Sequence, residues 1–274
     1  MKRICFLRFS GTGMTKYVVE KIRLALEQKQ AQVDVFDIEN TPAQNIPLDH
    51  YNAIGIAYPV HAFNAPQIVV DFVRRLPKAE SLDTFVFGTA GDHHWANFAS
   101  STLLIKILQK KGFCVFYDRP FIMPSNFIVK DDETKVRNKI DKINAEIPVV
   151  VHEIMNRVAY RQQGSSFAKA AAVIGRAEWF GLKCVKLFYA DKNRCDGCGV
   201  CAAKCPNHNI TIKESRAVFR WNCGLCMRCL YICPKRAIKI HRPFGFIGFD
   251  TWYHADFAYI ASKSPDTSSR RRPE

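Results

Sequence analysis

The sequence predicts an α/β domain with a doubly wound, five-stranded parallel sheet over residues 1–160, and a small α+β domain over residues 191–242. Three observations lead to this interpretation. The chain of 274 residues is long enough for two modest domains. Strand-like apolar runs alternate with helix-like amphipathic runs through the first 160 residues. Eight of the eleven cysteines fall in two compact sets in the last third.

The alternation in the first part follows a strand–helix order. Five apolar runs have the length of buried strands, at residues 3–9, 32–36, 52–58, 84–89 and 113–117. Amphipathic runs that predict helices cover residues 15–29, 66–75, 95–111 and 131–160. Strands that alternate with helices predict a parallel sheet covered by helices on both faces.

Three further segments complete the organisation. Residues 161–190 mix Lys and Arg with large apolar side chains, and we interpret them as a basic amphipathic linker. We expect it to pack on one of the domains rather than to lie on a membrane surface. Residues 243–261 form an aromatic extension, expected to cover the cysteine-rich domain or to pack it on the first domain. Residues 262–274 have the composition of a disordered tail.

The charge is unevenly distributed along the chain. The net charge is +15, of which residues 1–158 contribute +3 and residues 159–274 contribute +12. A basic half predicts an acidic redox protein or enzyme as partner, then an anionic membrane surface, then nucleic acid, in that order. No base-reading motif suggests specific nucleic-acid binding. The N-terminus lacks the pattern of a signal peptide and no apolar run has the length of a membrane span, so we expect a cytoplasmic protein.

The two cysteine sets share one pattern, C-x2-C-x2-C-x3-C-P, at residues 195–206 and 223–234. In two-cluster ferredoxins the first three cysteines bind one [4Fe–4S] cluster and the fourth binds the other. We therefore assign cluster I to Cys195, Cys198, Cys201 and Cys233, and cluster II to Cys223, Cys226, Cys229 and Cys205. Zinc is the alternative, but its structural sites pair two C-x2-C units across a spacer, and two such runs in succession disfavour it.

The segment between the two motifs fits the hairpin of a bacterial ferredoxin, with strands at residues 209–212 and 217–220. Four protein thiolates saturate each cluster, which therefore moves electrons and does not bind substrate. The remaining cysteines are Cys5, Cys114 and Cys184, and we interpret them as small buried hydrophobic residues.

A loop rich in glycine and hydroxyl side chains joins the first expected strand to the first expected helix. Backbone N–H groups and the helix dipole at such a place favour a phosphate group. The loop has neither the lysine of G-x4-G-K-[ST] nor the pattern G-x-G-x-x-G, so a mononucleotide phosphate is the expected ligand. The expected cofactor-binding residues are Ser10, Gly11, Thr12, Gly13, Met14 and Thr15.

Two more loops follow the third and fourth expected strands, which end at the same edge of the sheet. A ligand of an open α/β sheet lies beyond these ends. The expected residues of the first loop are Pro59, Val60, His61, Ala62, Phe63 and Asn64, and those of the second are Thr89, Ala90, Gly91, Asp92 and Trp95. Tyr58, Phe63 or Trp95 could stack on an aromatic ring system, and His93 or His94 could adjoin it; ordinary packing or exposure is the alternative for each.

The glycine-rich loop resembles the flavodoxin signature [ST]-x-T-G-x-T, which holds the phosphate of FMN; Met14 stands where flavodoxins often carry Asn. With the cysteine motifs after it, the chain resembles the EFR1-type flavodoxin–ferredoxin fusion family. This resemblance implies FMN and two [4Fe–4S] clusters in one electron-transfer protein. The leading interpretation is a relay between FMN, the clusters and a partner protein, with no protein group assigned a catalytic role. The alternative is an FMN-dependent oxidoreductase that reduces a quinone or another small molecule, with His61, His93 or His94 as proton donor.

Overall fold

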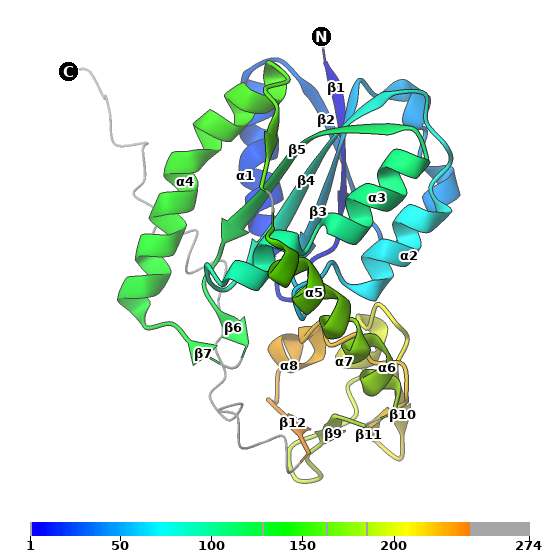
Figure 1. The fold of residues 1–274 in the computed structure, drawn as a ribbon. Coiled ribbons are helices and arrows are strands. Elements are labelled where there is room, and N and C mark those ends of the chain that lie inside the picture. Colours follow the sequence, from blue (N-terminus) through cyan, green and yellow to red (C-terminus); the bar gives the residue numbers. More distant parts are fainter. Residues whose placement is uncertain (1, 128, 163, 185, 242–274) are drawn as a thin grey trace, which may run out of the picture.

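A parallel sheet with helices on both faces forms the first part of the chain (Figure 1). The structure, a computed structural model, describes residues 2–127, 129–162, 164–184 and 186–241. The strand order β2-β1-β3-β4-β5-β8 contains the 2-1-3-4-5 order of flavodoxin-like sheets. The strands are β1 (Arg3–Arg8), β2 (Gln32–Asp37), β3 (Ala53–Pro59), β4 (Leu82–Ala90), β5 (Phe113–Ile122) and β8 (Tyr160–Arg161).

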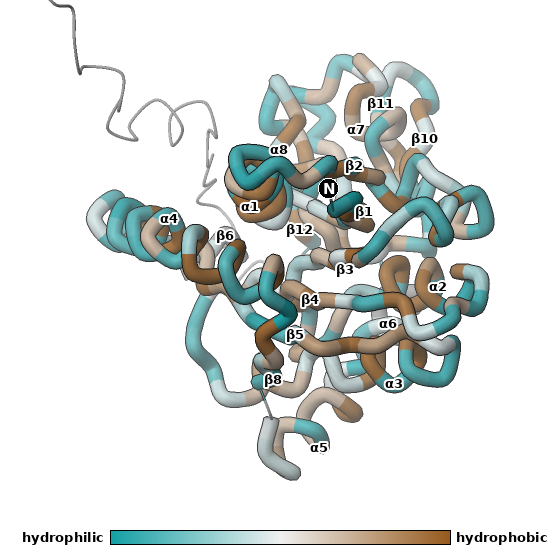
Figure 2. Tube along the Cα trace, turned by 90° about the horizontal axis from the view of Figure 1, so that it is seen from above, coloured by the Kyte–Doolittle hydropathy of each residue, from teal (hydrophilic) through white to brown (hydrophobic). Residues whose placement is uncertain are grey.

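The two faces of this sheet have separate hydrophobic cores. Successive side chains of a strand point to opposite faces, so Phe6 of β1 packs with one core and Leu7 with the other. Figure 2 shows hydrophobic residues along β3, β4 and β5, as expected for strands buried on both sides. Helices α1 (Met14–Gln28) and α4 (Glu133–Met155) cover one face, and α2 (Gln67–Arg75) and α3 (Thr102–Lys110) cover the other.

The five expected strands are confirmed, and the sheet has one strand more than predicted. The last helix ends at Met155 rather than at residue 160, because Arg157 takes the left-handed conformation (φ 55°) and turns the chain. The backbone of Tyr160 then pairs with Tyr117, which creates β8. A strand of two exposed residues is too short to show the hydrophobic alternation by which a strand is predicted from sequence. The helix expected at 95–111 is divided into the 3-10 helix η3 (Trp95–Ala99) and α3.

Phe87 provides a test of the core beneath α1 and α4. Its side chain is fully buried, and its ring contacts the rings of Phe85 and Phe121 at 5.3 and 5.2 Å between centroids. Phe87→Ala is expected to lower the free energy of unfolding by about 3–5 kcal/mol, because a large cavity replaces the ring. Phe167→Ala is the matched control, since Phe167 is 81% exposed and its loss should cost no more than about 0.5 kcal/mol. Urea denaturation of both variants measures the difference, and equal midpoints would contradict the prediction.

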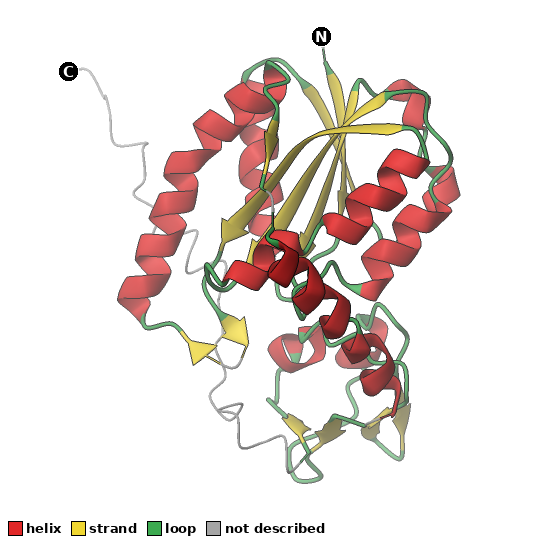
Figure 3. Cartoon of the chain, in the orientation of Figure 1, coloured by secondary structure: helices red, strands yellow, loops and turns green. Residues whose placement is uncertain are grey.

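The second part of the chain is built from short elements around its own core (Figure 3). Two antiparallel pairs of strands flank two short helices, and the hairpin expected between the cysteine motifs is confirmed. Strand β9 lies before residue 191, the predicted start of this domain. The elements are β9 (Phe188–Ala190), α7 (Val200–Ala203), β10 (Ile210–Lys213), β11 (Arg216–Phe219), α8 (Arg228–Ile232) and β12 (Ile238–Ile240).

Two helices, α5 (Ser166–Gly175) and α6 (Ala177–Cys184), connect the two parts. The small side chains of α5, Ala168 and Ala172, are buried against Ala99 of η3. Helix α5 therefore packs on the first domain, as the sequence led us to expect of the linker. The short hairpin of β6 (Asn126–Phe127) and β7 (Val129–Lys130) precedes α4. The aromatic extension at 243–261 and the tail at 262–274 lie outside the described residues.

Candidate functional site

The three loops expected to bind a cofactor lie together at the carboxyl edge of the sheet (Figure 1). Strands β1, β3 and β4 are parallel neighbours, so their carboxyl ends meet at one edge. The chain leaves β1 toward β2 on one side, whereas β3 lies on the other. This reversal is the topological switch point at which open α/β sheets bind their ligands.

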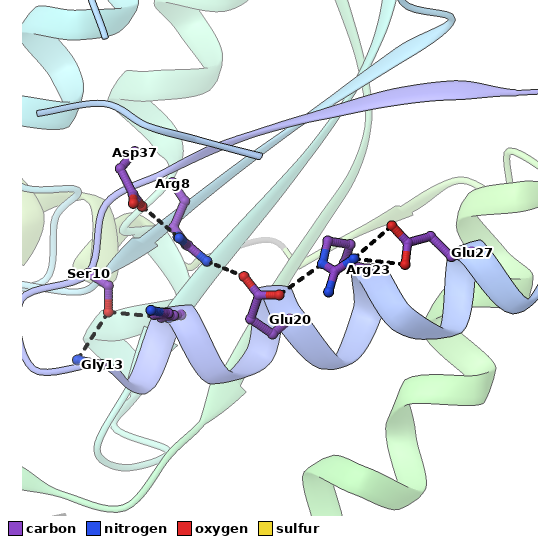
Figure 4. Close-up of polar contacts among 8 residues, drawn as sticks. Arg8, Ser10, Gly13, Glu20, Arg23, Glu27 and Asp37 are labelled. Atoms are coloured by element: carbon purple, nitrogen blue, oxygen red, sulfur yellow. Dashed lines mark hydrogen bonds and ion pairs between the residues drawn. The ribbon is translucent and has the colours of Figure 1, made fainter. Parts of the chain in front are cut away.

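The loop after β1, which is the expected phosphate cradle, turns into α1 at a left-handed glycine. Gly13 has a φ of 101° in the left-handed region and directly precedes α1, which has no acidic residue in its first turn. The Ser10 hydroxyl accepts hydrogen bonds from the backbone N–H groups of Gly13 at 3.1 Å and Lys16 at 3.2 Å (Figure 4). The Thr15 hydroxyl lies 2.8 Å from that of Thr89 and ties this loop to β4. Met14 points into the core beneath α1, so its side chain is not part of the cradle's polar surface.

A chain of ion pairs holds β1, β2 and α1 in place beside this loop (Figure 4). Arg8 donates to Asp37 and to Glu20, each at 2.7 Å, and its side chain is only 7% exposed. Burial alone lowers the pKa of Arg8, but the two carboxylates outweigh it and raise the pKa overall. Arg8 therefore stays charged and occupied by carboxylates, and it supports the scaffold of the loop.

The loop after β3 is strained and fastened to the linker. Ala62 and Phe63 both have positive φ angles, 41° and 64°, which residues other than glycine rarely adopt. The Asn64 amide donates to the carbonyl oxygens of Ala62 at 2.9 Å and Ala172 at 2.6 Å, and its own oxygen accepts from Arg176. Asn64 thus joins this loop to α5 and does not point its amide at a ligand.

Phe63 and Trp95, the aromatic candidates in the loops after β3 and β4, lie next to His94, whereas Tyr58 lies in the core. The Phe63 ring stacks on His94 at 5.3 Å between centroids, and Trp95 lies 5.2 Å from His94. Trp95 is 50% exposed. Tyr58 is fully buried in the core beneath α2 and α3, so of the alternatives left open it takes ordinary packing.

The polar groups of these loops form internal contacts. The Asp92 carboxylate accepts from the backbone N–H of His94 at 3.1 Å and from the Asn97 amide at 3.0 Å. Lys139 of α4 donates to the Gly91 carbonyl at 2.7 Å, a contact that the sequence analysis missed because it spans 48 residues. Burial lowers the pKa of His61 to about 4, which leaves this imidazole neutral near pH 7. Pro59 and Thr89 are register partners at the ends of β3 and β4, and Val60 and Ala90 follow them at the same edge.

The cysteines gather in the two sets that the motif predicts. One small cavity is lined by Cys195, Cys198, Cys201 and Cys233 together, which we call set I. In the other, set II, burial raises the pKa of Cys223 to about 12, and the adjacent thiols of Cys226 and Cys205 add to the effect. Burial also raises the pKa of Cys229, and the thiols of Cys226, Cys223 and Cys205, followed by Cys201 of set I, add to the effect. The fourth cysteine of each motif thus lies with the first three of the other.

The backbone around the two sets repeats itself. Gly197 and Leu225 each stand two residues after the first cysteine of their motif, and both have positive φ angles. The same holds for Gly199 and Met227, four residues after it. Backbone N–H groups point at the sulfurs: Asn209, Leu225 and Ala237 donate to Cys205, Cys223 and Cys233 at 3.2, 3.4 and 3.3 Å. Such N–H···S contacts are those that a cluster bound by thiolates needs.

Set II lies directly against the first domain. A Cβ atom built on Gly11 would meet the carbonyl oxygen of Cys226 at 2.1 Å. A cavity of about 30 Å³ is lined from both sides, by Phe9 and His61 of the first domain and by Cys223 and Cys226 of the second. The cavity at set I has only residues of the second domain in its lining. Set II is therefore the nearer set and set I the farther one.

A known protein family matches the sequence of the second domain. Residues 187–234 match the family model of the 4Fe-4S dicluster domain. Among curated proteins, DNA-directed RNA polymerase subunit Rpo3 of Methanosarcina acetivorans is 38% identical over 50 residues, 17% of this chain and 19% of that protein. The same subunit of Methanosarcina mazei is 29% identical over 111 residues, 37% of this chain and 40% of that protein. The matches span a fifth to two fifths of the length of these relatives.

Solved structures resemble the first domain. A flavodoxin from Megasphaera elsdenii is 19% identical with a TM-score of 0.36, over 43% of this chain and 84% of that one. An azoreductase from Bacillus anthracis is 9% identical with a TM-score of 0.43, over 56% and 100% of the two chains. By its own sheet topology and by the family match, the chain combines a flavodoxin-like α/β domain with a ferredoxin-type 4Fe-4S domain. No helix within the described residues has the length and hydropathy to cross a membrane.

Proposed function

We propose that the protein is an electron carrier that contains FMN and two [4Fe–4S] clusters, and that it relays electrons between the flavin and a redox partner. The observation that carries this proposal is the contact between set II and the Ser10–Thr15 loop, at Gly11 and Cys226. Two separate redox modules would have no reason to approach so closely. The order of the two modules also supports membership of the EFR1-type flavodoxin–ferredoxin fusion family.

The residues present fit both kinds of cofactor. The loop of residues 10–15 presents backbone N–H groups at the start of a 15-residue helix without a nearby carboxylate in its first turn, which suits the phosphate of FMN. Sets I and II each offer four cysteines, and backbone N–H groups donate to the sulfurs of Cys233 in set I and of Cys205 and Cys223 in set II, which suits one cluster each. When bound, FMN exchanges two electrons and each cluster exchanges one, so the chain converts between two-electron and one-electron carriers.

The positions of the two sets suggest an order. Set II adjoins the loops of the first domain, whereas the cavity of set I is lined by the second domain alone. Cys198 of set I is exposed. We propose that set II exchanges electrons with the flavin side and that set I serves the partner.

Anaerobic purification followed by cofactor analysis and potentiometric titration tests the proposal. We expect one FMN and about eight iron atoms per chain, from two clusters of four. A protein that carries iron but neither retains nor takes up FMN would contradict the flavin part. A protein with one metal ion per cysteine set would contradict the clusters.

A second candidate function rests on the exposure of the loop after β4. Trp95 is half exposed and adjoins His94, whose ring stacks on Phe63, at the carboxyl edge, where a small molecule could reach a bound ring system. In this case the protein would be an FMN-dependent oxidoreductase acting on a quinone or a similar acceptor. Steady-state assays with quinones and nicotinamides distinguish the two functions, since fast turnover without a partner protein excludes a pure carrier.

The basic surface near set I predicts an acidic partner and a salt-dependent association. Lys235 and Arg236 follow the last cysteine motif and are both exposed. Lys235→Glu is expected to slow electron transfer to an acidic partner severalfold at low salt and less at high salt, because complementary charge mainly raises the association rate. Lys78→Glu is the matched control, since this exposed lysine between α2 and β4 lies at the opposite edge of the sheet. Stopped-flow rates as a function of ionic strength give the answer; equal effects of both substitutions would contradict docking at set I.

A further inference from the structure

Arg228 connects the second cysteine motif to the loop of the first domain. It is the first residue of α8 and lies between the set II ligands Cys226 and Cys229 in the sequence. Its guanidinium donates to the carbonyl oxygens of Ser10 at 2.7 Å and Gly11 at 3.4 Å. It also forms an ion pair with Glu39, which follows β2, and the Arg228 side chain is only 16% exposed.

Gly11 allows the backbone of the second cysteine motif to come close to the loop of the first domain. Gly11 is not among the residues with positive φ, so its backbone conformation is open to other residues. Space is the constraint: any Cβ atom would lie 2.1 Å from the Cys226 carbonyl oxygen. Gly11 therefore allows the second domain to approach the loop, and Arg228 holds it there.

The contacts of Arg228 fall on the reverse side of the expected cradle. Its guanidinium binds the carbonyl oxygens of the Ser10–Gly11 and Gly11–Thr12 peptide groups. The N–H groups of these same two peptides belong to Gly11 and Thr12, which are cradle residues. A peptide group whose carbonyl accepts a hydrogen bond from a cation is polarised and becomes a stronger N–H donor. The carbonyl groups of this loop thus face Arg228, and in the proposed site its N–H groups would face the phosphate.

We propose that Arg228 and Gly11 couple phosphate binding at the loop to docking of set II, so that each event strengthens the other. This inference rests on the proposed FMN site, because the ligand that drives the coupling is the phosphate monoester of the cofactor. Docking orients and polarises the loop before the phosphate arrives. By linkage, a bound phosphate tightens the hold of the loop on Arg228 by the same factor. Arg228 is a positioning residue that acts through the backbone of the loop.

The test compares FMN with riboflavin, which lacks the phosphate, in the iron-loaded full chain. Arg228→Met removes the guanidinium and Gly11→Ala blocks the approach without any change of charge. Both variants should bind FMN on the order of tenfold more weakly, within the usual range of such couplings, and riboflavin with unchanged affinity. Arg220→Met is the matched control, an exposed arginine after β11 in the same domain, and should bind both ligands like the wild type. If Arg228→Met fails to load its iron, Glu39→Gln replaces it in the test, because it keeps the shape of the carboxylate but removes the ion pair with Arg228; it should also weaken FMN binding and leave riboflavin binding unchanged.

Hydrogen exchange gives the reciprocal measurement. FMN should slow amide exchange in residues 226–232 of the wild type, whereas riboflavin should not, and the Arg228→Met variant should lose this effect. If the wild type prefers FMN but both variants keep its full affinity, the coupling is wrong and the proposed function stands. If the wild type binds FMN no better than riboflavin, the phosphate site itself is wrong, and the coupling with it.

Discussion

If the proposed relay is right, a Cys229→Ala variant assayed with saturating FMN will keep its set I cluster but lose electron exchange between the flavin and that cluster. Cys229 belongs to set II, which is the set that adjoins the loops of the first domain. The substitution removes one of four thiolates, and alanine offers no replacement ligand, so the iron content should fall by about half. Anaerobic stopped-flow reduction of the flavin should then leave the set I cluster oxidised, as its electron paramagnetic resonance spectrum would report.

The matched variant Cys201→Ala separates position from simple loss of iron. Cys201 is buried and lines the cavity of set I, so with the proposed clusters this variant should also lose about half of its iron. Its flavin should still exchange electrons with set II, whereas transfer to an external partner should stop. The two variants thus lose the same number of iron atoms and different halves of the path. Identical behaviour of both would contradict the order in which set II lies next to the flavin.

Local patterns in the sequence were sufficient for the fold of the first domain. The strands β1, β3 and β4 are apolar runs because both faces of the sheet are buried, and such runs are visible in the sequence without knowledge of the contacts. Strand β8 was missed, since two exposed residues are too few to form a pattern. Its existence depends on the turn at Arg157 and on the free edge of β5.

The candidate site was predictable where its residues are close in the sequence. The cysteine spacing and the Ser10–Thr15 loop are local motifs, and the gathering of Cys205 with Cys223 follows a general rule of two-cluster ferredoxins. Arg228 is different, because its partners Ser10 and Glu39 lie 218 and 189 residues away. Gly11 has the same character: nothing near it in the sequence indicates that the Cys226 carbonyl takes the place of a side chain.

Removal of iron will unfold the second domain and leave the first domain folded. Within the described residues, the core around the two sets consists of few large side chains, among them Phe188, Phe219 and Leu230, and includes Cys201 and Cys233 themselves. In the part of the chain that the structure describes, its sheets have two strands each, and such sheets are marginal in isolation. A core of this size rarely supplies more than about 3–5 kcal/mol, and a metal cluster usually makes up the rest. Without iron the buried thiols no longer share a metal cluster that cross-links the chain, and the small core that remains does not hold the domain folded.

Limited proteolysis after anaerobic chelation measures this prediction. Trypsin should cut rapidly within residues 187–241, whereas a fragment that contains β1 to β5 should persist, because the first domain has two cores of its own. Loss of iron also frees Arg228 from the loop, so FMN affinity should fall to that of the Gly11→Ala variant in the same experiment. The Phe87→Ala substitution serves as the converse control, since it weakens the first domain without touching a thiol. If the chelated protein resists trypsin as well as the iron-loaded one, the second domain folds through its packing alone, and the clusters do not contribute to its stability.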